Sequence, residues 1–280
     1  MTKQAIYDLH THSNASDGKL SPSELVSHAY QAGITHLALT DHDSVSGIQE
    51  AEKQSQQHGI KLISGIELSC RWLSYTIHIV GLNIDPENDS LLKHIQDLSE
   101  LREDRAKRIS RQLEKVGIND AYYYAKQLSG DGTITRQHFA MHIVKTGHAK
   151  TIQDVFKKYL TRNKPGYVAV DWPDIKQTIN CIQQANGIAV IAHPLRYKMT
   201  NTKLKALVIE FKEKSGEGIE VASGNSNNDE LNRATTLCKQ FELFASTGSD
   251  FHNPDMPWTK LGKLAPIPEI LTPVWANWHH

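Results

Sequence analysis

Histidines and carboxylates follow the first apolar segment of this chain at a spacing that could hold a metal ion. His10 and His12 stand two residues apart after the apolar run 5–7, so both side chains project to one side of an extended strand. Asp17 follows in a loop of serine, asparagine and glycine residues. Imidazole and carboxylate groups gathered at the carboxyl end of a strand are typical ligands of transition metals. The pair alone does not distinguish a metal site from two surface histidines.

The same pattern returns at the ends of later expected strands. Its further members are His42, Glu67, His78, His193, Asp250 and His252. In parallel α/β proteins the carboxyl ends of the strands share one face, and that face carries the chemistry. Scattered surface histidines would not fall preferentially at strand ends, so we expect one site that holds more than one ion. Nitrogen and oxygen ligands without a thiolate suit Mn²⁺, Zn²⁺ or Fe²⁺.

Alternating strands and helices are expected to position these residues. Strand patterns cover residues 5–7, 35–40, 61–67, 75–81, 188–194, 218–221 and 243–250. Helical patterns cover residues 21–33, 45–58, 174–184, 202–214 and 229–241. Ser21, Pro22 and Glu24 form a capping box with proline in the first turn. This order predicts an α/β protein with a mostly parallel sheet or barrel.

A helical segment interrupts this alternation between residues 86 and 165. Helical patterns cover residues 91–116, 121–128, 136–145 and 152–160, with no strand pattern between them. We therefore expect a barrel domain made of residues 1–85 and 166–280, with a helical insertion at 86–165. Arginines 102, 105, 108 and 111 form a stripe that we interpret as a solvated face paired with Glu100, Glu103, Asp104 and Glu114.

Composition excludes several classes of function. The 280 residues carry 31 Lys and Arg against 31 Asp and Glu, so any contact with nucleic acid must be local. No apolar run has the roughly 18 residues of a membrane span, and the N-terminus lacks a signal-peptide stretch. The 3 cysteines are far apart, without metal-site spacing. We expect a cytoplasmic protein that neither binds a membrane nor requires a protein partner.

Several motifs, in order, resemble the PHP superfamily, named for polymerase and histidinol phosphatase. They are residues 8–18 (DLHTHSNASDG), 39–43 (LTDHD) and 65–70 (GIELSC), the lone His78, 192–194 (AHP) and 249–252 (SDFH). The resemblance implies a distorted (β/α)7 barrel with a trinuclear centre at its carboxyl face. It implies that two to three divalent ions bind there, with Mn²⁺ first and Zn²⁺ or Fe²⁺ as alternatives.

The resemblance also assigns the nine ligands to three ions. One ion would take His10, His12, Glu67 and Asp250. A second would take Glu67, His78 and His193, with Glu67 bridging. The third would take Asp17, His42 and His252.

Within this superfamily the chain is most similar to the bacterial branch of nucleoside 3′,5′-bisphosphate phosphatase and ribonuclease AM. The marks are the compact first motif, residues 134–140 and residues 193–197, although Gln137 stands where many members have proline. This similarity implies a phosphoesterase that acts on nucleoside 3′,5′-bisphosphates or on short 5′-phosphorylated RNAs. It would remove the 3′-phosphate from the former or the 5′ nucleotides from the latter, by attack of a metal-bridging hydroxide.

Other residues are candidates to bind the substrate or move protons. Arg136 and Arg196 are expected to grip a second phosphate, because a guanidinium binds phosphate oxygens in a bidentate manner. Lys164 and Tyr167 are further candidates for the same pocket. Asp43 and His138 could assist proton transfer, and the general acid for the leaving group stays unassigned.

Three other interpretations stay open at this point. The chain could be a histidinol-phosphatase-like enzyme, a PHP proofreading exonuclease acting on DNA, or a non-catalytic metal-binding regulatory protein. The absence of a polymerase segment in 280 residues counts against the exonuclease. Full metal content without turnover of any phosphoester would favour the regulatory protein.

Overall fold

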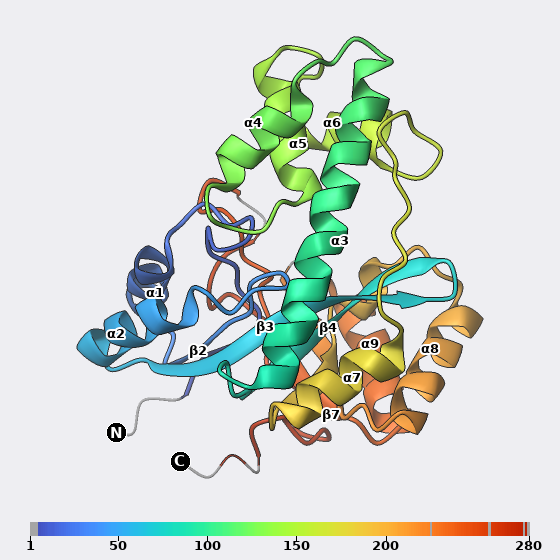
Figure 1. Ribbon diagram of the computed structural model, residues 1–280. Helices are drawn as coiled ribbons and strands as arrows, with labels where there is room; N and C mark the ends of the chain where they lie inside the picture. The colour runs from blue at the N-terminus through green and yellow to red at the C-terminus, as the bar shows by residue number, and fades with distance from the viewer. Residues whose placement is uncertain (1–4, 225, 257–258, 277, 279–280) are drawn as a thin grey trace.

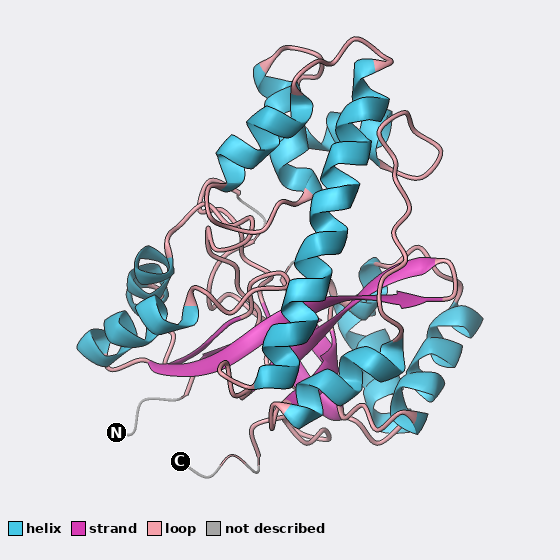
Figure 2. Ribbon diagram, viewed as in Figure 1, coloured by secondary structure: helices cyan, strands magenta, loops and turns pink. Residues whose placement is uncertain are grey.

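Seven strands form one sheet that curls into a nearly closed barrel in the computed structural model, which describes residues 5–224, 226–256, 259–276 and 278 (Figures 1 and 2). Neighbours follow chain order, and the strands are β1 (Tyr7–Asp8), β2 (His36–Leu39), β3 (Lys61–Trp72), β4 (Tyr75–Leu82), β5 (Ile188–Ile191), β6 (Gly218–Ser223) and β7 (Phe244–Gly248). The segment after β1 meets β7, because the Leu9 amide donates to the Thr247 carbonyl at 3.0 Å. The expected seven-stranded barrel is confirmed.

Strand β4 runs against the direction of the other strands. It pairs antiparallel with both β3 and β5, whereas the remaining pairs of neighbours are parallel. Strand β3 is longer than expected, so Glu67 lies inside it, and His78 lies inside β4; the predicted positions of both residues at strand ends are wrong. The antiparallel register nevertheless places Glu67 opposite Val80 and Ser69 opposite His78. Glu67 and His78 are therefore only two positions apart along the ladder, and their side chains belong to the same end of the barrel.

Helices pack around the barrel and bury its outer face. They are α1 (Pro22–Gln31), α2 (Ile48–His58), α7 (Ile175–Gln184), α8 (Asn201–Glu213) and α9 (Asn228–Gln240). The predicted capping box of α1 is present at Ser21 and Glu24. Buried leucine, isoleucine and phenylalanine side chains of these helices join the strands in one large core, as Leu25, Leu37 and Phe211 do. Among the described residues, no helix combines the length and apolarity of a membrane span.

The helical segment carries a second apolar core of its own. It comprises α3 (Asp89–Glu114), α4 (Ala121–Ser129), α5 (Arg136–Lys145), α6 (Ile152–Val155) and a π-helical turn (Phe156–Leu160). Helix α3 reaches from the sheet to α4–α6 (Figure 1). Leu91 and Leu98 pack in the barrel core, whereas Ile109 and Leu113 pack with Phe139 in the second core. The domain boundaries at 86 and 165 stay a prediction, supported by the separate cores and bridged by α3.

Arg102 of α3 is buried, so the interpretation of its stripe as a solvated face is wrong at this position. Its Nε donates to Asp43 Oδ2 at 2.6 Å and its Nη2 to Ser69 Oγ at 2.8 Å. Arg108 is exposed and pairs with Asp104 at 3.3 Å, as expected. A step of three residues turns a helix by about 300°, so a stripe at this spacing rotates from the buried face to the exposed face.

Gly248 generates a prediction about barrel closure. A Cβ atom at this position would lie 2.2 Å from His10 Cβ and 2.8 Å from its backbone nitrogen. We expect Gly248→Ala to lower the free energy of unfolding by about 1–3 kcal/mol or more, because β7 must move away from β1. Denaturant unfolding measures this. Gly47→Ala is the control, since its nearest atoms belong to side chains at 3.0 Å or more. Equal losses in both variants would contradict a tight seam.

Candidate metal centre

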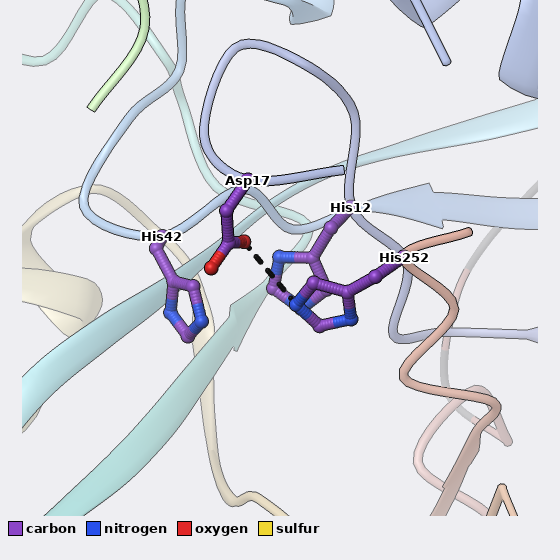
Figure 3. A group of neighbouring side chains, drawn as sticks. All are labelled: His12, Asp17, His42 and His252. Carbon is purple, nitrogen blue, oxygen red and sulfur yellow. Dashed lines mark ion pairs between the residues drawn. The ribbon is translucent and has the colours of Figure 1, made fainter. Parts of the chain in front are cut away.

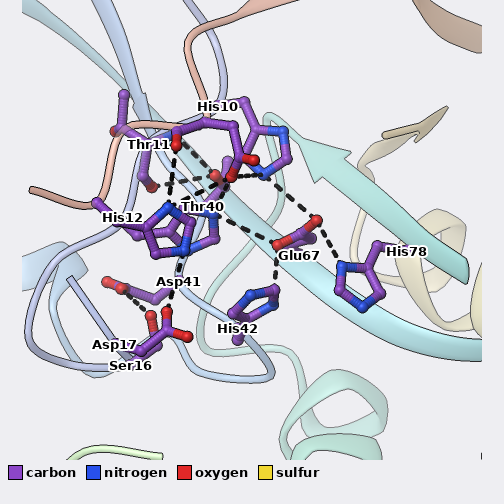
Figure 4. A network of polar contacts seen from close by, with 12 residues as sticks. His10, Thr11, His12, Ser16, Asp17, Thr40, Asp41, His42, Glu67 and His78 are labelled. Atoms are coloured by element: carbon purple, nitrogen blue, oxygen red, sulfur yellow. Dashed lines mark hydrogen bonds and ion pairs between the residues drawn. The ribbon is translucent and has the colours of Figure 1, made fainter. Parts of the chain in front are cut away.

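The buried carboxylate of Glu67 lies at the centre of a group of imidazoles (Figure 4). Its Oε1 atom lies 2.9 Å from His78 Nδ1 and 3.1 Å from His193 Nε2. Its Oε2 atom lies 2.8 Å from His42 Nδ1. The Nε2 atoms of His10 and His12 each lie 3.4 Å from one of these oxygens. Residues from separate segments of the chain therefore converge on one carboxylate.

A second group of donors lies beside the first. His12, Asp17, His42 and His252 each offer one atom, and these atoms all lie within 4.8 Å of one another (Figure 3). His252 Nε2 lies 3.2 Å from Asp17 Oδ1. Asp250 connects the two groups, because its Oδ1 atom lies 3.3 Å from His12 Nε2 and 3.5 Å from His252 Nδ1. The structure thus brings all nine predicted ligands together.

Asp41 holds the loop that carries Asp17. The buried Asp41 carboxylate accepts hydrogen bonds from the Ser13 amide at 2.8 Å and from the hydroxyls of Ser13 and Ser16 at 2.6 Å each. A Cβ atom at Gly18 would lie 2.4 Å from the His12 carbonyl oxygen, so only glycine fits where the loop 13–18 folds back on His12. The serine and glycine residues of the first motif therefore position the donors on either side of them.

Glu220 is a residue that the sequence interpretation missed. Its side chain, in β6, is buried. The Oε1 atom lies 2.5 Å from His10 Nδ1, and the Oε2 atom accepts a hydrogen bond from the His193 amide at 2.6 Å. Ser223 Oγ donates to the same Oε2 at 3.1 Å. Because Nδ1 of His10 bonds to Glu220, its Nε2 is the nitrogen turned toward Glu67. The only signal in the sequence was an acidic residue inside a short apolar strand.

The electrostatics of the cluster keep its buried carboxylates ionised. Burial alone would raise the pKa of the Glu67 carboxyl, but His42, His78 and His10 hold it well below its usual range. Burial likewise opposes ionisation of Asp17. The neighbouring His252 and His42 nevertheless hold the pKa of this carboxyl well below its usual range. Burial, aided by the positive charge of His252, lowers the pKa of His12 to about 3. Ionised carboxylates and a neutral imidazole coordinate metals directly. Despite burial, however, the carboxylates raise the pKa of His10, His42 and His252, so binding of a cation at these three imidazoles releases protons.

Several buried ligand atoms of the cluster lie close to one another, yet they have no hydrogen bond of acceptable geometry among the described residues. They are Nε2 of His10, both ring nitrogens of His12, Oδ1 of Asp17, Nδ1 of His42 and Oε2 of Glu67. Buried polar atoms are nearly always satisfied, so a convergent set of unsatisfied donors indicates a missing partner. The residues present therefore fit divalent cations. The assignment of individual ligands to three ions stays a prediction.

A cavity of about 450 Å³ joins the cluster to the helical segment. Asp17, His42 and His78 form one side of it, and the other side includes Arg102, Arg105, Thr135, Arg136, Phe156 and Trp172. In the described part of the chain, neither Arg105 nor Arg136 forms an ion pair with a carboxylate, and their guanidinium carbons lie 5.6 Å from the centroids of the Trp172 and Phe156 rings, respectively. Burial and the neighbouring Arg136 and Arg102 lower the pKa of Arg105 to about 9. Two unpaired guanidiniums make this cavity suited to an anion.

The remaining predicted substrate residues divide between two sides of the cluster. Arg136 lines the cavity, whereas Tyr167 is absent from its lining. Lys164 is exposed and is absent from the cavity wall. Arg196 lies elsewhere, where its Nη1 contacts the Asp250 carboxylate. Roles in substrate binding stay predictions for all four residues.

Both candidates for proton transfer make structural contacts, and their role in proton transfer stays a prediction. Asp43 accepts from Arg102 and from the Ser69 amide at 2.7 Å, so its carboxylate ties α3 to the barrel. His138 is buried, and its Nδ1 accepts from the Thr135 amide at 3.1 Å, which caps α5. Both side chains have structural roles in this arrangement.

Comparisons with known proteins agree with this geometry. The family model of the PHP domain matches residues 8–187. A 5′-3′ exoribonuclease of Haemophilus influenzae is 45% identical over 275 residues, which cover 98% of this chain and 99% of that protein. A 3′,5′-nucleoside bisphosphate phosphatase of Chromobacterium violaceum is 39% identical over 269 residues, which cover 96% and 94%. The solved structure of an amidohydrolase from Chromobacterium violaceum has a TM-score of 0.92 at 39% identity, covering 97% and 95%.

Glu220 generates a prediction about metal affinity. The carboxylate accepts from three donors, and a glutamine amide could accept with one oxygen only. We expect Glu220→Gln to weaken binding of Mn²⁺ about 10–100-fold, because a carboxylate bonded to a ligating histidine fixes the orientation of its ring. Bound metal per chain and competition with a chelator measure this. Glu217→Gln is the control, since Glu217 stands three residues earlier and contacts the Ala189 amide at 3.3 Å. Unchanged affinity in Glu220→Gln would rule out the positioning role.

Proposed function

This chain belongs to the PHP domain family, and from that premise we propose that it is a metal-dependent phosphoesterase of nucleotides and RNA. It removes the 3′-phosphate of nucleoside 3′,5′-bisphosphates and releases 5′ nucleotides from short 5′-phosphorylated RNAs. The observation that carries this proposal is the placement of two unpaired guanidiniums, Arg105 and Arg136, in a cavity that the candidate metal ligands also line.

The nine convergent side chains are proposed to hold two to three divalent ions, with Mn²⁺ first. His10, His12, Glu67 and Asp250 would hold one, and Glu67 would share the second with His78 and His193. Asp17, His42 and His252 would hold the third. When bound, such ions neutralise phosphoryl oxygens and lower the pKa of the water molecules that they bind, so that hydroxide is available at neutral pH.

The side chains of this protein orient the substrate on both sides of one ribose. Arg105 and Arg136 bind the 5′-phosphate, because guanidinium groups pair with phosphate oxygens in a bidentate manner. The shared wall of Asp17, His42 and His78 then places the 3′-phosphate against the cluster. The first nucleotide of a 5′-phosphorylated RNA offers the same two phosphates. One pocket therefore accepts both classes of substrate.

Arg102 keeps the two halves of this site together. Its bonds to Asp43 and Ser69 join α3 to the segments that carry His42 and Glu67. Its guanidinium is thus occupied by the protein and leaves Arg105 and Arg136 to the substrate. Arg196, which contacts Asp250, stays a proposed phosphate ligand on the opposite side of the cluster.

The first test of this function uses metal-loaded protein. We expect release of phosphate from adenosine 3′,5′-bisphosphate and release of mononucleotides from a short 5′-phosphorylated RNA. Removal of the ions with a chelator should abolish both activities and lower the melting temperature, because ions that bind only the folded state stabilise it. Inactivity on both substrates, with hydrolysis of histidinol phosphate, would overturn the proposal.

The second test concerns the 5′-phosphate pocket. We expect Arg105→Ala and Arg136→Ala each to lower kcat/KM for adenosine 3′,5′-bisphosphate about 10–100-fold, since each removes a charged hydrogen bond of about 1.5–3 kcal/mol. Hydrolysis of p-nitrophenyl phosphate, which lacks a second phosphate, should change little. Arg108→Ala on the exposed face of α3 is the matched control. Equal losses on both esters would argue against a phosphate clamp.

A further inference from the structure

Two stretches of this chain carry concentrated positive charge without a single acidic residue. Residues 155–170 contain Lys157, Lys158, Arg162 and Lys164. Residues 194–209 contain Arg196, Lys198, Lys203 and Lys205. The side chains of all eight are exposed, in a protein whose formal net charge is zero. Such local stretches attract polyanions.

The stretch at 155–170 adjoins the 5′-phosphate pocket. Phe156 lines this cavity, and its ring lies 5.6 Å from the guanidinium carbon of Arg136. On the proposed function, the 5′ end of the RNA terminates at this side.

The stretch at 194–209 begins on the other side of the cluster. It directly follows His193, and Arg196 contacts Asp250. Tyr197 lies against the cluster, because its hydroxyl accepts from the His78 amide at 2.8 Å. A separate cavity of about 440 Å³ lies here, lined by His193, Arg196, Glu220, Ser223, Ser226 and Glu230 among others. It shares no lining residue with the 5′-phosphate cavity.

Two lysines continue this stretch away from the cluster. Lys198 follows Arg196 by two residues and is exposed. The Lys203 ammonium lies 5.3 Å from the centroid of the Tyr75 ring, at the start of β4, and 3.3 Å from its hydroxyl. This contact with an aromatic face holds the ammonium in place. Two carboxylates line the cavity beside this stretch, of which Glu220 bonds to His10 and Glu230 accepts from the Asn227 amide at 3.0 Å.

The polarity of an RNA chain then decides which stretch it follows. With the 5′-phosphate at Arg105 and Arg136 and the next phosphate at the cluster, the rest of the chain must leave toward His193. Resting on the proposed function, we propose that Arg196, Lys198 and Lys203 bind the backbone phosphates 3′ of the bond that is cleaved. A nucleoside bisphosphate has no such phosphates. The stretch would therefore strengthen binding of RNA and leave binding of small nucleotides unchanged.

Charge reversal at the two exposed lysines tests this surface. We expect Lys198→Glu combined with Lys203→Glu to lower kcat/KM for an unstructured 5′-phosphorylated RNA of about 8 nucleotides by tenfold or more. The slope of log KM against log salt concentration should fall by about 1.4, because each of the two lysines loses one phosphate contact and each contact of a single strand contributes about 0.7 to the slope. Activity on adenosine 3′,5′-bisphosphate should change less than about twofold, because it does not reach the lysines.

The other basic stretch supplies the matched control. Lys157→Glu combined with Lys158→Glu makes the same change of charge beside the 5′-phosphate pocket and should affect RNA much less. Equal loss with both double variants would show attraction by overall charge and overturn the assignment. A larger loss with the control pair would place the RNA on the opposite side.

The length of the RNA gives a second measurement. The wild-type protein should bind the longer RNA more tightly than a 5′-phosphorylated dinucleotide, and the Lys198/Lys203 variant should lose this difference. Fluorescence anisotropy with a 3′-labelled RNA whose linkages resist hydrolysis measures binding without turnover. Wild-type protein that hydrolyses the bisphosphate but shows no gain with length would overturn the surface and leave the phosphatase intact. Inactivity on bisphosphate and RNA alike would overturn the proposed function itself.

Discussion

The burial of one carboxylate, Glu67, is the constraint on which the rest of this structure depends. An ionised carboxylate removed from water is strongly destabilising unless charged or polar partners surround it. Here the partners are imidazoles from distant segments, so the barrel must close for them to meet. The Asp250 amide donates to the His10 carbonyl at 2.8 Å across the seam between the first and last strands. Closure of the sheet and assembly of the cluster are therefore the same event.

The sequence allowed the fold class and the nine donors to be predicted, because the motifs are local and occur in a recognisable order. It did not reveal that Glu67 and His78 lie inside strands, since side-chain alternation is the same for parallel and antiparallel pairing. Glu220 was missed because its partner His10 is 210 residues away. Arg102 was misinterpreted for the same reason, since charge spacing along a helix does not say which face meets the barrel, and Asp43 lies 59 residues earlier.

Helix α3 connects the two parts of the proposed site, the barrel and the helical segment. The barrel contributes the metal donors, and the helical segment contributes the guanidiniums, with the buried bond between Arg102 and Asp43 at the junction. The aromatic ring of Trp172, where the chain returns to the barrel, lies 5.4 Å from the Arg102 guanidinium carbon and 5.6 Å from that of Arg105. The separation between the two phosphate positions is thus set by rigid, packed elements.

A site of this kind selects its substrate by the spacing of two phosphates rather than by the base. In the proposed binding mode, guanidiniums at one end and a cation cluster at the other would hold a single nucleotide by its ends, and neither end requires a particular base. The same arrangement explains how one protein could act on a small bisphosphate and on the end of an RNA. The two substrates differ only beyond the second phosphate, where on the proposed path the remaining nucleotides of an RNA would meet the protein at the side of His193. Preference between them is then a property of the surface outside the pocket, where exposed charges can change without disturbing the donors around Glu67.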